Sequence, residues 1–259
     1  MSNISRPVCL VTGSASGIGA ACAVHFASHG WDIGVCYLDE ATRADAEQVA
    51  ESCRARGAQT LVQLLDVTRS DDCVRVARSL EAHFGRLDAL LNCAGTTRFI
   101  KHADLDALDG DEFHRTYDVN VVGMYRITKS CAPALRRSGI GAVVNISSIA
   151  GLHGVGSSVA YAASKGAVNT LTLSLARALS PGIRVNAIAP GYVSGGLPSR
   201  VLDHASLEKV ERDYMQTQAL PRLLQTDEVA ALAFFLVVQA PGMTGEVIRL
   251  DNGLHLHAR

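Results

Sequence analysis

A regular alternation of short apolar runs with helical patterns extends along the 259-residue chain and constrains its fold more than any other feature. The apolar runs are typical of buried strands and cover residues 8–11, 33–37, 60–65, 87–91, 142–146, 184–188 and 246–250. Helical patterns cover residues 20–27, 41–56, 70–84, 111–137, 158–179 and 226–238. This alternation predicts an α/β fold with a seven-stranded parallel sheet and crossover helices on both of its faces.

The composition agrees with one large α/β domain that spans residues 1–259. Hydrophobic residues make up 48% and charged residues 19%, which at this length is enough for a sizeable core. The formal net charge of -1 gives no reason to expect nucleic acid or an anionic membrane as a partner. The longest apolar run, residues 229–238, is too short to cross a bilayer, and the first residues lack the pattern of a signal peptide. We therefore expect a soluble, cytoplasmic protein.

The cysteines and histidines do not indicate a metal site or a disulfide framework. Seven cysteines are scattered along the chain without a Cys-x-x-Cys pair, which predicts buried thiols in a reducing compartment. No histidine pair has the spacing of a zinc motif, so no metal ligand is predicted.

A glycine-rich turn follows the first predicted strand and precedes the first predicted helix. In Thr12-Gly-Ser-Ala-Ser-Gly-Ile-Gly19, the three glycines allow a sharp turn and a close approach of the backbone to a ligand. The N-terminus of the helix offers free N–H groups to a pyrophosphate. The sequence therefore predicts dinucleotide binding here, although an ordinary tight connection gives the same local pattern.

Other polar features also follow predicted strands. In an open parallel sheet, ligands bind beyond the carboxyl ends of the strands, and these features should meet at that edge. They are Thr12 to Gly19, Asp66, Asn92 to Gly95, Ser147-Ser148 and Pro190-Gly191.

Tyr161 and Lys165 lie four residues apart in a predicted helix, so that both side chains share one face. The unperturbed pKa of a phenol is about 10. A neighbouring ammonium favours the phenolate, so we expect Lys165 to lower the pKa of Tyr161 and to suit it for proton exchange. Ser148, at the end of the preceding strand, could hold the other side of a carbonyl or alcohol oxygen. The alternative is an aromatic ring packed under a solvated lysine.

Two further polar residues are candidates for the same site. Asn120 falls inside the predicted helix 111–137, where asparagine is a poor helix former, and it could open the helix locally and use its carbonyl or amide. An exposed helical asparagine is the alternative. His153 follows Ser148 by five residues and could line a substrate pocket or lie in a plain loop.

Taken in order, these motifs resemble the short-chain dehydrogenase/reductase family over nearly the whole chain, in its branch of chains near this length. The resemblance implies a Rossmann-type, doubly wound, mainly parallel sheet in a single domain. It rests on Thr12-Gly-x-x-x-Gly-Ile-Gly19, Asp66-Val67, Asn92-Cys-Ala-Gly95, Asn120, Ser148, Tyr161-x-x-x-Lys165, Pro190-Gly191, Thr244-Gly245 and Asp251-Asn-Gly253.

The resemblance, which includes 3-oxoacyl-ACP-reductase-like members, implies an NAD(P)-dependent oxidoreductase that moves a hydride between nicotinamide and a carbonyl or secondary alcohol. It implies that Tyr161 is the acid/base, that Lys165 lowers its pKa and holds the nicotinamide ribose, and that Ser148 positions the substrate oxygen. It also implies that Asn120 helps to carry a water-linked proton relay. A catalytically inactive dinucleotide-binding sensor or partner subunit with the same fold is the alternative function.

The resemblance further implies which residues contact the dinucleotide. These are Gly13, Ser16, Gly17, Ile18, Gly19, Tyr37, Leu38, Asp39, Asp66, Val67, Asn92, Ala94, Gly95, Tyr161, Lys165, Pro190, Gly191 and Val193.

The choice between NAD and NADP depends on the end of the second predicted strand. Asp39 and Glu40 disfavour an additional ribose 2′-phosphate there, whereas Arg43 could compensate, so the sequence favours NAD over NADP. Residues 192–224, which we expect to be largely irregular with one polar helix-like stretch and no clear strand, should line the pocket for a small carbonyl or alcohol substrate. The substrate's identity stays open, and relatives imply a homo-oligomer, either a dimer or a tetramer.

Overall fold

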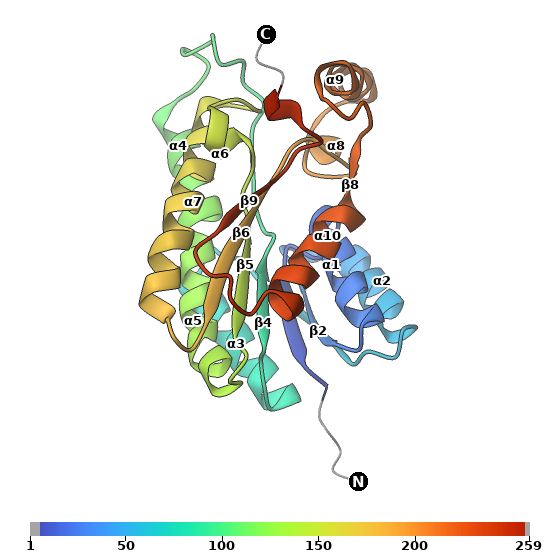
Figure 1. Ribbon diagram of the computed structural model, residues 1–259, viewed down its shortest axis with the longest axis vertical. Helices are drawn as coiled ribbons and strands as arrows, with labels where there is room; N and C mark the ends of the chain where they lie inside the picture. The colour runs from blue at the N-terminus through green and yellow to red at the C-terminus, as the bar shows by residue number, and fades with distance from the viewer. Residues whose placement is uncertain (1–5, 257–259) are drawn as a thin grey trace.

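The fold is organised around one parallel sheet, which lies in the middle of the molecule (Figure 1). The structure is a computed structural model that describes residues 6–256. Its seven strands lie in the order β3-β2-β1-β4-β5-β6-β9, which confirms the predicted doubly wound α/β fold. The strands are β1 (Val8–Thr12), β2 (Asp32–Tyr37), β3 (Thr60–Leu64), β4 (Ala89–Asn92), β5 (Ala142–Ile146), β6 (Arg184–Pro190) and β9 (Val247–Leu250).

Helices cover both faces of the sheet and place apolar side chains against it. Helices α1 (Gly17–Ser28), α2 (Arg43–Arg54) and α10 (Thr226–Phe234) lie on one face (Figure 1). The other face is covered by α3 (Ser70–Phe84), α5 (Met124–Arg137) and α7 (Val159–Leu179), with α4 (Gly110–Tyr117) and the short α6 (Ala150–His153) against α7.

Strand β1 shows why these strands are apolar throughout. Because successive side chains of a strand point to opposite faces, Cys9 and Val11 join the cluster under α1 and α10, whereas Val8 and Leu10 join the cluster under α3 and α5. A strand buried on both faces needs apolar residues at every position rather than at alternate ones.

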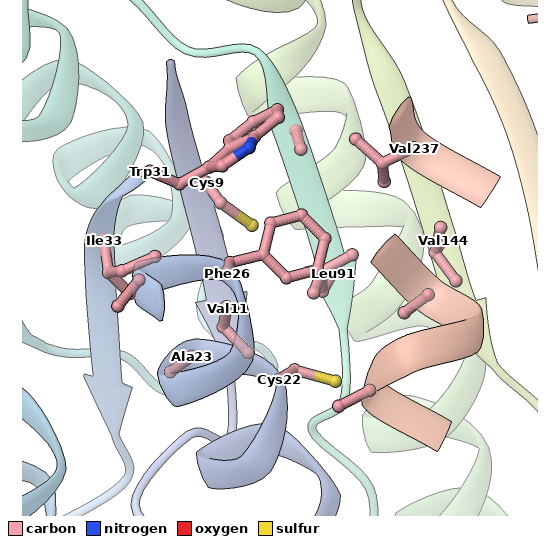
Figure 2. Packing of buried hydrophobic residues seen from close by; sticks show 14 of the residues in the cluster. Cys9, Val11, Cys22, Ala23, Phe26, Trp31, Ile33, Leu91, Val144 and Val237 are labelled. Atoms are coloured by element: carbon pink, nitrogen blue, oxygen red, sulfur yellow. The ribbon is translucent and has the colours of Figure 1, made fainter. Parts of the chain in front are cut away.

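Phe26 connects α1 to its neighbours in the first of these clusters (Figure 2). Its ring packs edge-to-face with Trp31 and Phe234, at centroid distances of 5.3 and 5.1 Å. The contact with Phe234 holds α10, from near the end of the chain, against α1, which carries the glycine turn at its N-terminus.

The predicted helix 111–137 is interrupted where Asn120 lies. Helix α4 ends at Tyr117, a π-helical segment covers Asp118–Gly123, and α5 begins at Met124. The expectation that Asn120 opens the helix locally is therefore confirmed.

One predicted helix start is wrong, because the side chain of Asp39 caps a separate turn before the helix begins. The helix expected from residue 41 begins at Arg43, after a 3₁₀ turn over Glu40–Thr42 whose N-cap is Asp39. Helix α10 begins at Thr226, as predicted, and its N-cap is Gln225. A π-helical segment, Phe235–Gln239, follows α10, and a 3₁₀ turn, Leu254–Leu256, follows β9.

The segment 192–224 lies beyond the carboxyl ends of the strands (Figure 1). It contains α8 (Pro198–Val201) and α9 (His204–Thr217). The expectation of no strand is wrong, because β7 (Val193–Ser194) pairs in parallel with β8 (Leu224–Gln225) and joins the two ends of the segment. Strands of two residues are too short to produce a visible alternation of side chains.

All seven cysteines lie in the described part of the chain, residues 6–256. They are free, and six of them are buried. None of the helices in this part combines the length and the apolar character that crossing a membrane requires.

We expect Phe26→Ala to lower the free energy of unfolding by about 3–5 kcal/mol, because the truncation removes a fully buried ring and leaves a cavity. Urea denaturation followed by circular dichroism measures this loss. Leu105→Ala is the matched control, since Leu105 is 68% exposed and its truncation should change stability by no more than about 0.5 kcal/mol. Equal effects of the two substitutions would contradict the packing described here.

Candidate active site

A cavity of about 850 Å³ opens at the carboxyl edge of the sheet. Its walls combine the glycine turn after β1, the ends of β2 to β6, the start of α7 and the segment 192–224. Most residues that the sequence predicts as site residues line it: Gly13, Ser16, Gly17, Ile18, Gly19, Tyr37, Leu38, Asp66, Val67, Ala94, Gly95, Ser148, Tyr161, Lys165, Pro190, Gly191 and Val193.

The glycine turn brings the N-terminus of α1 close to β1. Gly13 and Gly17 have φ angles of +61° and +57°, a region that residues with a Cβ rarely adopt. A Cβ on Gly19 would lie 2.4 Å from the carbonyl oxygen of Gly13, so only glycine fits there. The hydroxyl of Ser16, the N-cap, is buried and has no partner in the described chain. Free N–H groups, a helix N-terminus and an unpaired hydroxyl suit the pyrophosphate of a dinucleotide.

Not every predicted cofactor contact turns its side chain toward the cavity. The amide of Asn92 donates to Thr128 at 3.0 Å and to Asn145 at 2.8 Å, inside the protein. Thr12 instead fixes the loop after β4, because its hydroxyl accepts from the N–H groups of Cys93 and Ala94, both at 3.0 Å. The backbone around Asn92 is thus held in place by hydrogen bonds, while its side chain lies outside the cavity wall.

Tyr161 and Lys165 share one face of α7, as their spacing predicts. The Nζ atom of Lys165 lies 5.6 Å from the centre of the Tyr161 ring and donates to the carbonyl of Ile146 at 2.7 Å. That hydrogen bond ties α7 to the end of β5. Ser158 begins the helix by accepting from the N–H of Tyr161 at 3.2 Å.

The two serines after β5 have different surroundings. Ser147 is buried, and its hydroxyl donates to Asn169 on α7 at 2.6 Å. Ser148 lines the cavity, accepts from the N–H of Ala150 at 3.1 Å and hydrogen-bonds to Tyr161. The arrangement leaves Ser148 facing the cavity beside the phenol, whereas Ser147 fastens the strand to the helix.

Burial governs the protonation of the two titratable groups. It raises the pKa of Tyr161 to about 12, and the hydrogen bond with Ser148 offsets only part of this rise. Burial also lowers the pKa of Lys165 to about 8. The expected net lowering of the Tyr161 pKa is therefore wrong, because desolvation by burial is the largest influence on it.

Asn120 lies behind the cavity wall and holds the loop after β4. Its Oδ1 atom accepts from the N–H of Thr96 at 2.8 Å, and its amide donates at 3.0 Å to the carbonyl of Thr96 and to the hydroxyl of Ser164. The side chain is engaged within the protein, and a Cβ on Gly95 would lie 3.3 Å from its oxygen.

The end of β2 presents Tyr37, Leu38 and Thr42 to the cavity. Asp39 does not line it, because its carboxylate caps the following turn by accepting from the N–H of Thr42 at 3.0 Å. Arg43 contacts Glu40 at 3.4 Å on the surface.

Sequence patterns did not single out several residues of the wall. Among them are Thr96, Thr97, Phe99, Arg115, Ser157 and Tyr214. They come from loops, from α4 or from the polar helix α9, and no local motif marks them. His153, by contrast, is exposed and does not line the cavity.

The doubly wound sheet, the glycine turn and the serine, tyrosine and lysine at one point of the cavity define the class of a dinucleotide-binding α/β oxidoreductase. Comparisons with known proteins agree. A family model described as enoyl-(acyl carrier protein) reductase matches residues 13–255. The chain belongs to the short-chain dehydrogenase/reductase family, and it is an oxidoreductase that acts on CH–OH and C=O groups with a nicotinamide dinucleotide.

Individual relatives cover nearly the whole chain. A protein of Streptomyces violaceoruber named as ketoacyl reductase 2 of the granaticin polyketide synthase is 38% identical over 250 residues, 96% of each chain. A 3-oxoacyl-(acyl-carrier-protein) reductase of Staphylococcus aureus is 31% identical and covers 95% of this chain and 97% of its own. A crystal structure described as a short-chain dehydrogenase/reductase from Burkholderia xenovorans has 48% identity and a TM-score of 0.91, and covers 97% and 99% of the two chains.

The lowered pKa of Lys165 predicts how stability depends on pH. Between about pH 8 and the unfolded value of 10.5, the unfolded chain holds a proton on this residue that the folded chain has lost. The free energy of unfolding of the wild type should therefore rise by up to ~3 kcal/mol over this range relative to that of Lys165→Met, which has no titrating group at this position. Urea unfolding of the dinucleotide-free protein at pH 7 and pH 10.5 measures the difference.

Lys129→Met serves as the control for this experiment, because Lys129 is exposed on α5. Its stability should run parallel to that of the wild type at both pH values. If the free energy of unfolding of Lys165→Met also changed with pH as that of the wild type does, Lys165 would not be held in a desolvating site.

Proposed function

We propose that this protein transfers a hydride between the nicotinamide of NAD or NADP and the carbon of a ketone or secondary alcohol, with Tyr161 as the general acid and base. The observation that carries the proposal is the meeting of Ser148, Tyr161 and Lys165 in the cavity that the glycine turn also lines. When bound, the nicotinamide supplies or accepts the hydride. The protein's own residues supply alignment and the proton.

Ser148 holds the reacting oxygen beside Tyr161. Since its oxygen accepts from Ala150, its hydrogen is left to donate, either to the phenol or to a substrate oxygen. Tyr161, with a pKa raised to about 12, keeps its proton at neutral pH. It is therefore able to give that proton to the oxygen of a carbonyl that is being reduced.

Lys165 orients the dinucleotide and the proton path. One of its three N–H groups is used by Ile146, so two remain for ribose hydroxyls and for a water. A Cβ on Gly95 would lie only 3.9 Å from the Nζ atom, so the glycine keeps space open beside the ammonium. Asn120 supports a water-linked proton relay by fixing the loop that carries Gly95.

We further propose a modest preference for NAD. Leu38, which is exposed and lines the cavity, offers no cation for a 2′-phosphate. Arg43 forms an ion pair with Glu40. Asp39 repels the phosphate through its charge rather than by direct contact, because its carboxylate is directed to Thr42. The absence of a basic group at this point favours the unphosphorylated ribose.

Assembly and location follow as further proposals. Tyr117, Val122 and Tyr125 expose apolar surface on α4, the π-helical segment and α5. Covering this face with a second copy would remove the surface from water, which supports a homo-oligomer. We also propose a cytoplasmic location, as for a soluble enzyme with free cysteines.

We expect Tyr161→Phe to lower kcat by ~10²–10⁴-fold while dinucleotide binding survives, because the ring remains and only the transferable proton is lost. Steady-state turnover on a panel of ketones and alcohols, with both cofactors, and dinucleotide titration calorimetry give the two quantities. Tyr125→Phe, a change at an exposed tyrosine of α5, should leave both unchanged. Activity of Tyr161→Phe within about tenfold of the wild type would refute the assignment.

The cofactor preference has its own test. Leu38→Arg combined with Asp39→Ser should shift the ratio of kcat/KM for NADP over NAD by about tenfold or more, since a planar cation pairs with the 2′-phosphate. Serine is also a good N-cap, so the turn after β2 should persist. Asp39→Ser alone separates the lost repulsion from the added cation. A wild type that already prefers NADP strongly would show this proposal to be wrong.

A further inference from the structure

Besides the glycine turn, the cavity is lined by residues that surround the space next to the reacting centre. We call this space the substrate compartment. Its walls come from the loop after β4, α4, the start of α6, the α6–α7 loop and the segment 192–224, and they are mainly apolar. The apolar residues are Phe99, Ile149, Val155, Leu197, Val201 and Val210.

Most polar side chains of this compartment are already paired. The hydroxyls of Thr97 and Ser157 hydrogen-bond to each other. The guanidinium of Arg115 makes hydrogen bonds of 2.8 to 3.2 Å to the buried carboxylate of Glu112. Among the described side chains of this compartment, the cation of Arg115 is therefore already paired with a carboxylate.

Tyr214, on α9, is one exception. Its ring lines the cavity, and its hydroxyl has no hydrogen-bond partner in the described part of the chain. Burial raises its pKa, so the hydroxyl stays neutral and can donate. It lies close enough to the reacting centre that its charge, if it ionised, would raise the pKa of Tyr161.

A second tyrosine holds Tyr214 in place. The rings of Tyr192 and Tyr214 pack with centroids 5.1 Å apart and planes 30° apart. Tyr192, which is buried, donates from its hydroxyl to Glu211 at 2.9 Å, and Glu211 precedes Tyr214 by three residues on α9. Helix α9 is thus anchored to the sheet edge beside Pro190-Gly191, and the free hydroxyl has a defined position.

We propose that Tyr214 is a substrate-binding residue that donates a hydrogen bond to a second oxygen of the substrate, and that the substrates are uncharged, largely apolar ketones carrying that oxygen. The inference rests on the proposed function, because Ser148 and Tyr161 must hold the first, reacting oxygen. An ester, ketone or hydroxyl oxygen can accept from the phenol. A carboxylate would lose its hydration in this compartment and would have to compete with Glu112 for the guanidinium of Arg115.

The test compares ketones matched in length. Ethyl benzoylacetate and hexanophenone differ mainly in the ester oxygens, and ethyl 3-benzoylpropanoate and heptanophenone form a second pair with the other oxygen further away. The wild type should show kcat/KM about three- to tenfold higher for the two-oxygen member of at least one pair, the range expected for one hydrogen bond between neutral groups. The anion 4-benzoylbutyrate should be the poorest substrate.

Tyr214→Phe should abolish this preference, mainly through a higher KM for the two-oxygen ketone, while dinucleotide affinity and turnover of hexanophenone stay unchanged. A preference that survives in Tyr214→Phe would overturn the inference. So would a wild type that favours 4-benzoylbutyrate or that turns over none of the two-oxygen ketones. Tyr161→Phe distinguishes a failure of the proposed function, because full activity of that variant on every ketone would refute Tyr161 as the general acid and base and not the role of Tyr214.

Glu211 is a positioning residue in this proposal, because it acts through Tyr192. Glu211→Ala should raise KM for the two-oxygen ketone about three- to tenfold without changing kcat for hexanophenone. Glu211→Gln keeps an acceptor for the Tyr192 hydroxyl and should restore the wild-type KM. If Glu211→Ala and Glu211→Gln lost activity equally, on hexanophenone as well, the effect would be a general one on folding. That result would overturn the positioning role of Glu211.

Discussion

The hydrogen bond from Lys165 to the carbonyl of Ile146 is the interaction on which the rest of the site depends. It brings a buried ammonium to the end of β5 and thereby sets the position of α7 relative to the sheet. A Cβ on Gly151 would lie 2.3 Å from the carbonyl carbon of Lys165, so α6 and α7 approach at backbone distance. This contact between the backbones of α6 and α7 holds Ser148, at the end of β5, beside Tyr161 on α7.

Desolvation is the consequence of that arrangement. The same burial that fixes Lys165 lowers its pKa to about 8 and raises that of Tyr161 to about 12. The site therefore disfavours charge on both groups, and it contributes less to stability than a solvated surface would. A site that holds its acid protonated and its ammonium desolvated is costly in folding, but it is prepared for proton transfer to a carbonyl oxygen.

The substrate side of the cavity depends on a second anchor. Tyr192 follows Pro190-Gly191 at the end of β6 and carries the hydroxyl that binds Glu211. The pairing of β7 with β8 closes the same segment at its base. Together they turn a long insertion into a wall of defined shape, from which Tyr214 reaches the reacting centre.

The sequence by itself determined the parallel α/β sheet, the glycine turn and the shared face of Tyr161 and Lys165, because each follows from the local periodicity or the steric needs of neighbouring residues. It also marked Asn120 as a break in its helix, through the poor helix propensity of asparagine. Only the tertiary structure decided the pKa values of the site, the inward turn of the Asn92 side chain, the capping role of Asp39 and the approach of Tyr214 to Tyr161. These properties depend on burial and on partners that are distant in the chain, and no local pattern encodes them.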